Sequence, residues 1–158
     1  MKEPMSRSGE RSADVSYREL LASDMDAIFH VRIRTWHNPN GAEELKRLGI
    51  THASVCGMLK TSHRGWVAEH SDQIVGFVMG NRENGELWVI AVLREYENQG
   101  IGRQLMTLVE DWLWSVGWQE IWLTTDPDEN FRAVGFYRRL GWVDWKIENG
   151  DRFMRKTA

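Results

Sequence analysis

A glycine-containing corner at residues 99–103, Gln-Gly-Ile-Gly-Arg, is the feature of this chain that most constrains its fold. It follows a strand-like apolar run at residues 87–93 and precedes a helical pattern at residues 104–116. Two glycines separated by one residue let the backbone turn sharply and approach a ligand closely. The first N–H groups of a helix lack intrahelical acceptors, and the helix dipole favours an anion there. The corner therefore predicts a phosphate site built from main-chain N–H groups.

Length and composition narrow the class of protein. The 158 residues suffice for one domain with a sizeable core, and we expect a single domain at residues 14–158 after a flexible arm at residues 1–13. A net charge of −3 disfavours a general nucleic-acid partner, and no apolar run is long enough to span a membrane. Cys56 is the single cysteine, which excludes an internal disulfide and fits a reducing, cytoplasmic location.

Hydrophobic periodicity predicts an alternating series of strands and helices. We expect strands at residues 15–20, 66–69, 73–79, 86–93, 120–124, 142–147 and 152–155, and helices at residues 24–36, 42–59, 104–116 and 130–140. The second helical stretch is interrupted near Gly49, and Asn149-Gly150 forms the turn of a closing hairpin. This order predicts an α/β (α+β) fold with a mixed sheet and helices on both faces.

The glycine corner alone is a weak signal. It lacks the lysine of a phosphate-binding Walker loop, and Leu105 stands where a dinucleotide fingerprint needs its third glycine. A second segment, residues 130–142, follows after one strand and one turn and reads Asn-Phe-Arg-Ala-Val-Gly-Phe-Tyr-Arg-Arg-Leu-Gly-Trp. Together the two segments resemble the pyrophosphate motif and the second motif of the GNAT superfamily of acyl-CoA-dependent N-acyltransferases.

The resemblance implies a mostly antiparallel sheet whose central strand pair splays apart, with acetyl-CoA as co-substrate in the slot. The main chain that would hold acetyl-CoA belongs to Ile90, Ala91, Val92, Asn98, Gln99, Gly100, Ile101, Gly102 and Arg103. Asn130 matches a side chain near the pantetheine arm, and Tyr137 matches the general acid that reprotonates the coenzyme A thiolate. Glu97 and Asn98 depart from the family pattern, so we expect the cradle to depend on backbone donors.

Two residues are candidates for proton transfer. Glu86 heads the strand before the corner, where the resemblance to the histone-acetyltransferase branch implies a catalytic base, although it could equally be a strand-end charge after a turn. Tyr137 could be a core aromatic residue, but its place in the motif favours the acid. Cys56 lies in an apolar helical pattern and is expected to pack there rather than to carry an acyl group.

The acceptor side of the site is less specific. The resemblance implies that the first helices and their loop line the acceptor site, and this region contains Trp36 at the end of the first helix and His37 after it. Asp126 follows the strand at residues 120–124, so an aromatic group beside acidic residues suggests a cationic amine. Asp126 is explained equally well by turn chemistry. The five histidines show no metal-ligand spacing, so we expect no metal.

The sequence therefore predicts an N-acetyltransferase acting on a small-molecule or protein amine. The alternative is a catalytically weak acyl-CoA-binding or sensing module with the same fold. A nucleotide-binding Rossmann-like domain is disfavoured by the missing third glycine. An exposed Trp114 could mark a homodimer surface, although packing within one chain is the simpler interpretation.

Overall fold

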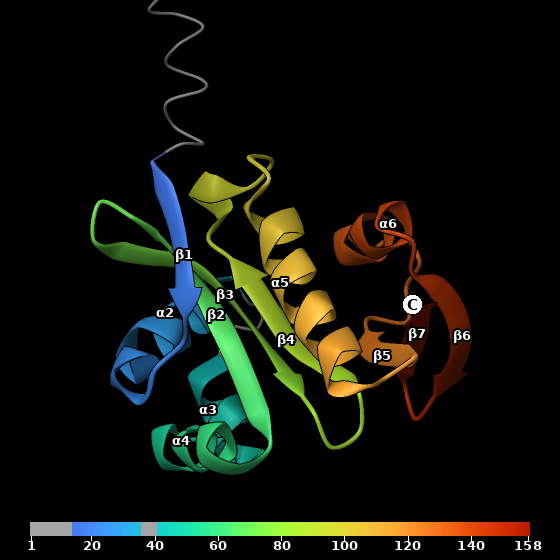
Figure 1. The fold of residues 1–158 in the computed structure, drawn as a ribbon, viewed down its shortest axis with the longest axis horizontal. Helices are drawn as coiled ribbons and strands as arrows, with labels where there is room; N and C mark the ends of the chain where they lie inside the picture. The colour runs from blue at the N-terminus through green and yellow to red at the C-terminus, as the bar shows by residue number, and fades with distance from the viewer. Residues whose placement is uncertain (1–13, 36–40) are drawn as a thin grey trace, which may run out of the picture.

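The computed structural model describes residues 14–35 and 41–158 and contains a seven-stranded sheet (Figure 1). In chain order the elements are β1 (Val15–Glu19), the 3-10 helix η1 (Ala22–Asp24), α2 (Met25–Thr35), α3 (Gly41–Arg47), α4 (His52–Thr61), β2 (His63–His70), β3 (Gln73–Asn81), β4 (Glu86–Val92), the 3-10 helix η2 (Arg94–Tyr96), α5 (Ile101–Val116), β5 (Glu120–Thr125), α6 (Arg132–Arg139), β6 (Val143–Glu148) and β7 (Asp151–Thr157). The expected arm at residues 1–13 lies outside the described residues.

The strand order β1-β2-β3-β4-β5-β7-β6 joins two antiparallel halves through one parallel contact. Strands β1 to β4 form an antiparallel meander, and β5, β7 and β6 form the second antiparallel group. Strands β4 and β5 are parallel and pair at Glu86 and Trp122, after which the ladder between them does not continue. The mixed, mostly antiparallel sheet with a splayed central pair is therefore confirmed.

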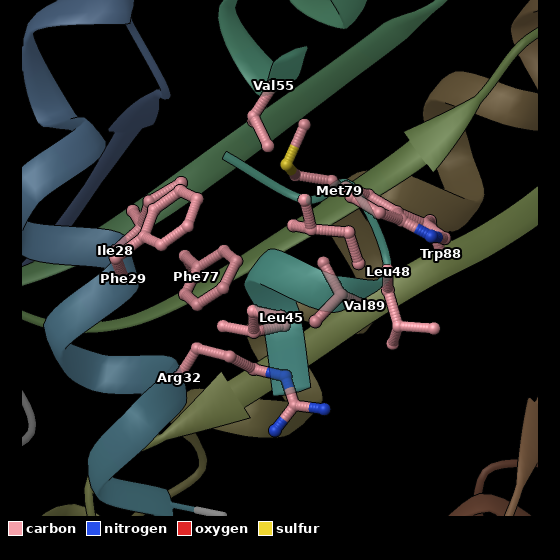
Figure 2. A pocket seen from close by; sticks show the side chains of 11 residues that line it. Ile28, Phe29, Arg32, Leu45, Leu48, Val55, Phe77, Met79, Trp88 and Val89 are labelled. Atoms are coloured by element: carbon pink, nitrogen blue, oxygen red, sulfur yellow. The ribbon is translucent and has the colours of Figure 1, made fainter. Parts of the chain in front are cut away.

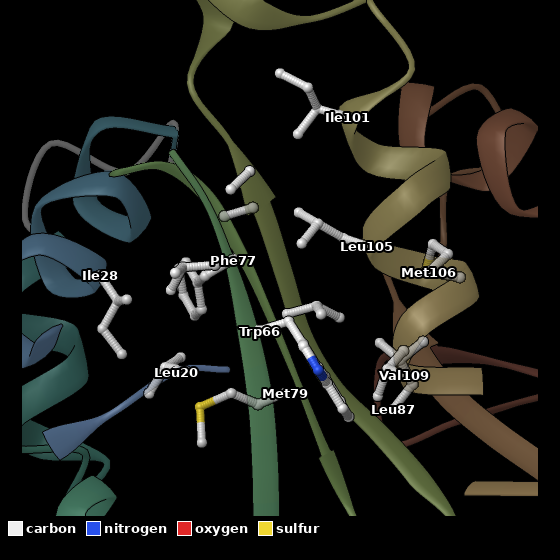
Figure 3. Packing of buried hydrophobic residues seen from close by; sticks show 14 of the residues in the cluster. Leu20, Ile28, Trp66, Phe77, Met79, Leu87, Ile101, Leu105, Met106 and Val109 are labelled. Carbon is white, nitrogen blue, oxygen red and sulfur yellow. The ribbon is translucent and has the colours of Figure 1, made fainter. Parts of the chain in front are cut away.

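Helices cover both faces of the sheet, as the sequence predicts. Figure 3 shows Ile28 of α2 packed with Phe77 and Met79 on one face, and Leu105 and Val109 of α5 on the other. This division follows the two-residue period of β3, whose alternate side chains point to opposite faces. Helices α3 and α4 lie on the α2 face, and α6 lies beside α5 (Figure 1).

Helix α5 approaches the sheet closely at a glycine. A Cβ atom on Gly80 would lie 2.7 Å from Cγ2 of Val109, so a larger residue would push the helix outward. The buried face of α5 includes Leu105, Val109 and Trp112, which match the apolar stripe of its sequence. In the part of the chain that the structure describes, no helix has the length and apolar character needed to cross a membrane.

The predicted element boundaries differ most at β2, which begins at His63 rather than at residue 66. His63 and Arg64 pair with Asn81 and Gly80 of β3, so the strand extends through polar residues that lack a strand-like pattern. Gly49 separates α3 from α4, as expected. Trp114 is partly buried against the core, which supports the packing interpretation.

A buried carboxylate ties α5 to the C-terminal half of the sheet. The Trp142 indole Nε1 donates to Oε2 of Glu110 at 3.0 Å, and Lys156 Nζ lies 2.8 Å from Oε1. Glu110 is only 7% exposed and Trp142 only 1%. The carboxylate thus satisfies donors from two segments that have little other polar connection to α5.

Replacing Glu110 by alanine should lower the free energy of unfolding by about 3 kcal/mol, because it leaves a partly buried ammonium and a buried indole N–H without their acceptor. Urea denaturation followed by tryptophan fluorescence measures this loss. The neighbouring Asp111→Ala removes an exposed carboxylate from the same helix and should change stability by no more than about 0.5 kcal/mol. Equal effects of the two substitutions would contradict this account of Glu110.

Candidate active site

The gap between β4 and β5 presents main-chain groups of β4. The N–H of Leu93 donates to the carbonyl of Val75 at 2.9 Å, so the backbone of Leu93 and of every second residue before it faces β3. The N–H and C=O groups of Ile90 and Val92 must then face the opposite edge, toward β5. Because β5 diverges there, this edge of β4 can pair with an extended ligand.

The glycine corner lies at the end of the same strand and forms the start of α5. Gly100 caps the helix with φ of +85°, and Asn98 has φ of +64°. The first helical hydrogen bond runs from Gln104 N–H to the carbonyl of Gly100. The N–H groups of residues 101–103 therefore precede the intrahelical ladder and form an anion site at the positive end of the helix dipole.

Arg132, which the sequence analysis did not single out, connects the corner to α6. Its Nη1 lies 2.7 Å from Oε1 of Glu97 and its Nη2 donates to Oδ1 of Asn98 at 3.0 Å. The acidic charge of Glu97 is therefore compensated by a cation from the second motif. The sequence shows a basic residue two positions after Asn130, but only the fold shows that it lies at the glycine corner.

Tyr137 lies on α6 and is buried, with its ring against Phe136 and Trp142. Burial raises the pKa of Tyr137 to about 12, and the positive charge of Arg32 opposes that rise. Arg32 belongs to α2, on the other face of the sheet from α6 (Figure 1). The Arg32 charge therefore acts on the Tyr137 phenol from the opposite face of the sheet.

Glu86 points to the α2 face of the sheet. Met79 and Asn81 are two residues apart on β3 and share a face, and their partners on β4 are Val89 and Glu86. A bulge between Met79 and Gly80 brings Val89 and Glu86, three residues apart, to that same face. Burial raises the pKa of Glu86, and a hydrogen bond with the Asn84 side chain partly offsets the rise.

A cavity of about 170 Å³ opens on the α2 face beside these residues (Figure 2). It is lined by Ile28, Phe29, Arg32, Leu45, Leu48, Ile50, Val55, Phe77, Met79, Trp88 and Val89. Ten of these side chains are apolar or aromatic, and Arg32 is the charged one. Burial lowers the pKa of Arg32, because its guanidinium lies in this apolar wall.

The structure does not bring Asp126, one of the predicted acceptor residues, close to Glu86. Trp36 and His37 lie outside the described residues. Asp126 follows the end of β5, four residues or about 13 Å along the strand from Trp122, the partner of Glu86. Its carboxylate accepts from the N–H of Asp128 at 2.9 Å, as a turn residue does.

Asn130 is exposed, and its N–H donates to the Asp128 carboxylate. It therefore begins the segment that leads into α6, close to Arg132. Among the described residues, no three His, Cys, Asp or Glu side chains gather in a group that could hold a metal ion.

Solved structures share the fold of this chain. The PaiA N-acetyltransferase of Thermoplasma acidophilum, in complex with coenzyme A, superposes with a TM-score of 0.81 at 18% identity, covering 91% of this chain and 99% of that one. At this identity the likeness shows the fold.

Two curated relatives are similar in sequence over part of their length. N-alpha-acetyltransferase 30 of Schizosaccharomyces pombe is 34% identical over 88 residues, 51% of this chain and 58% of that protein. A mycothiol acetyltransferase of Pseudarthrobacter chlorophenolicus is 36% identical over 64 residues, 40% of this chain and 20% of that protein. The chain thus spans little more than half of the first relative and a fifth of the second.

The family profile covers the two motifs and the elements that connect them. The profile described as the acetyltransferase (GNAT) family matches residues 25–142, from the start of α2 to the residue before β6. This range includes the splayed strands, the glycine corner, Glu86 and Tyr137. The chain therefore belongs to the acetyltransferase (GNAT) family.

Proposed function

We propose that this protein is an acetyl-CoA-dependent N-acetyltransferase that transfers an acetyl group directly to a primary amine. The observation that carries the proposal is the buried phenol of Tyr137 on α6, together with Glu86 at the point where β4 and β5 diverge and on the opposite face of the sheet. Family membership and the two acetyltransferases among the relatives support the same reaction. A module that only binds acyl-CoA would not need a buried acid and a base at such an opening.

The described residues fit acetyl-CoA as the donor, which supplies an acetyl thioester. Main-chain groups of Ile90 and Val92 would pair with the pantetheine arm, with Ala91 between them. The N–H groups of Ile101, Gly102 and Arg103 would hold the pyrophosphate, with Asn98, Gln99 and Gly100 forming the turn. Asn130 would lie beside the pantetheine arm. The buried Oε1 of Gln99, which has no donor among the described residues, supports a polar ligand here.

Glu86 and Tyr137 would move the two protons of the reaction. The amine nitrogen forms a bond to the acetyl carbonyl carbon as the bond from that carbon to sulfur breaks. Glu86 takes the proton that the amine loses, and its raised pKa makes it a stronger base than an exposed carboxylate. The hydroxyl of Tyr137 gives its proton to the departing thiolate. The main-chain N–H of Val92 would stabilise the developing oxyanion.

Tyr137→Phe should lower kcat about 100-fold and leave KM for acetyl-CoA nearly unchanged, because it removes the proton donor and keeps the ring packing. The release of coenzyme A thiol measures both constants, with the fastest of 2-phenylethylamine, spermidine and an alanine-initiated peptide as acceptor. Tyr17→Phe, on the outer strand β1, is the matched control and should behave as the unchanged protein. Full turnover by Tyr137→Phe would exclude this tyrosine as the acid.

Glu86→Gln should remove one ionisation from the acid side of the pH profile. A carboxylate acts as a base only above its pKa, and burial raises the pKa of Glu86 above that of an exposed glutamate, so kcat/KM should fall as the pH drops through this raised pKa. The pH dependence of kcat/KM with one acceptor should then show one bend fewer in the variant, with a rate about 100-fold lower at neutral pH. Identical profile shapes for both proteins would assign the base elsewhere.

Arg132→Ala should raise the Kd for coenzyme A about tenfold, since it leaves the Glu97 carboxylate uncompensated beside the phosphate cradle. Calorimetric titration with coenzyme A measures the change. Adding Glu97→Gln to this variant should restore most of the affinity, whereas Arg139→Ala on the same helix should have little effect. If the second substitution restores nothing, Arg132 acts on the ligand by another route.

A further inference from the structure

We propose that the cavity on the α2 face holds the carbon skeleton of the acceptor, so that the acceptor is a primary amine carrying one compact apolar group. This inference rests on the proposed function and names its substrate class. The sequence suggests an acceptor recognised through its positive charge. The cavity instead fits a monoamine, whose single nitrogen is the one that is acetylated.

The cavity lies beside the segment of β4 that carries the proposed base. Trp88 and Val89 form part of its wall and follow Glu86 on β4 by two and three residues. Val89 and Glu86 share a face because of the bulge opposite Met79. Arg32 of α2 lies in the same wall. An apolar group in the cavity would therefore place an attached amine near the opening between β4 and β5.

The positive charge in the cavity wall disfavours an acceptor that carries a second ammonium group. Among the described residues, the lining side chains include no carboxylate, and the charged group in the wall, Arg32, is positive. A second ammonium group would lose its hydration there beside a like charge, which is costly. A monoamine avoids this cost, because its nitrogen becomes neutral before it reacts and lies toward Glu86 rather than in the wall.

The size of the cavity limits the apolar group. The cavity has a volume of about 170 Å³ and opens at the surface beside Leu48. Apolar cavities of about 150 Å³ stay dry and accommodate benzene. A phenyl ring or a short branched alkyl chain thus fits. Leu48, 62% exposed, lies at the rim, where an apolar ligand would cover it (Figure 2).

Acceptor preference tests the chemistry of the cavity. The kcat/KM for 2-phenylethylamine should exceed those for propylamine and for spermidine by about tenfold or more, as apolar pockets discriminate by the surface they bury. A phenylalanine-initiated peptide, compared with the free amine, distinguishes a protein N-terminus from a small molecule as the source of the same apolar amine. Faster acetylation of spermidine than of 2-phenylethylamine would overturn the inference and leave the proposed function intact.

Direct binding tests the cavity without turnover. Titration with 2-phenylethylamine should quench the fluorescence of Trp88, and Leu48→Glu should weaken this binding about tenfold and shift turnover toward spermidine. Val116→Glu, at an exposed apolar site on α5 at the other face, should change neither. Binding of 2-phenylethylamine without acetylation of any amine would reject the proposed function alone. Equal weakening by both substitutions, or no binding, would reject the cavity as the acceptor site.

Discussion

The divergence of β4 from β5 is the constraint on which the rest of the structure depends. Parallel strands that part after one residue pair expose main-chain donors and acceptors in the middle of a sheet, where they are normally satisfied. In this fold the exposed edge lies between two motifs far apart in sequence. The glycine corner follows the end of β4, and the helix that carries Tyr137 lies beside α5. In the proposed function, this opening in the ladder is where acetyl-CoA would lie.

A gap in the middle of a sheet must be held open by contacts elsewhere. Close packing at Gly80 fixes α5 on the first half of the sheet, and Glu110 links α5 to the second half through Trp142 and Lys156. Arg132 adds a link between the glycine corner and α6. These contacts link the two halves of the sheet where β4 and β5 have no ladder between them.

The sequence predicted the order of the elements, the mixed sheet and the two motifs, because each depends on local periodicity or on glycine. It could not predict the contacts that give the site its charge. Arg132 reaches Glu97 only through the packing of α6 beside α5. Glu86 and Val89 share a face only because a bulge interrupts the alternation of β4. The cavity is assembled from α2, α3, α4 and two strands, so no single segment carries its apolar character.

In the proposed site, the positive charge of Arg32 affects both the proton donor, Tyr137, and the cavity for the acceptor. Burial favours the neutral form of Tyr137 and keeps its proton in place at ordinary pH, while the positive charge of Arg32 favours the phenolate. In the proposed reaction the phenol must lose its proton to a thiolate, and a nearby cation lowers the cost of that step. The same cation would raise the free energy of a second ammonium group in the cavity. Arg32 would therefore both assist proton transfer from Tyr137 and disfavour dicationic acceptors. Substrate preference and proton transfer would then depend on the same side chain.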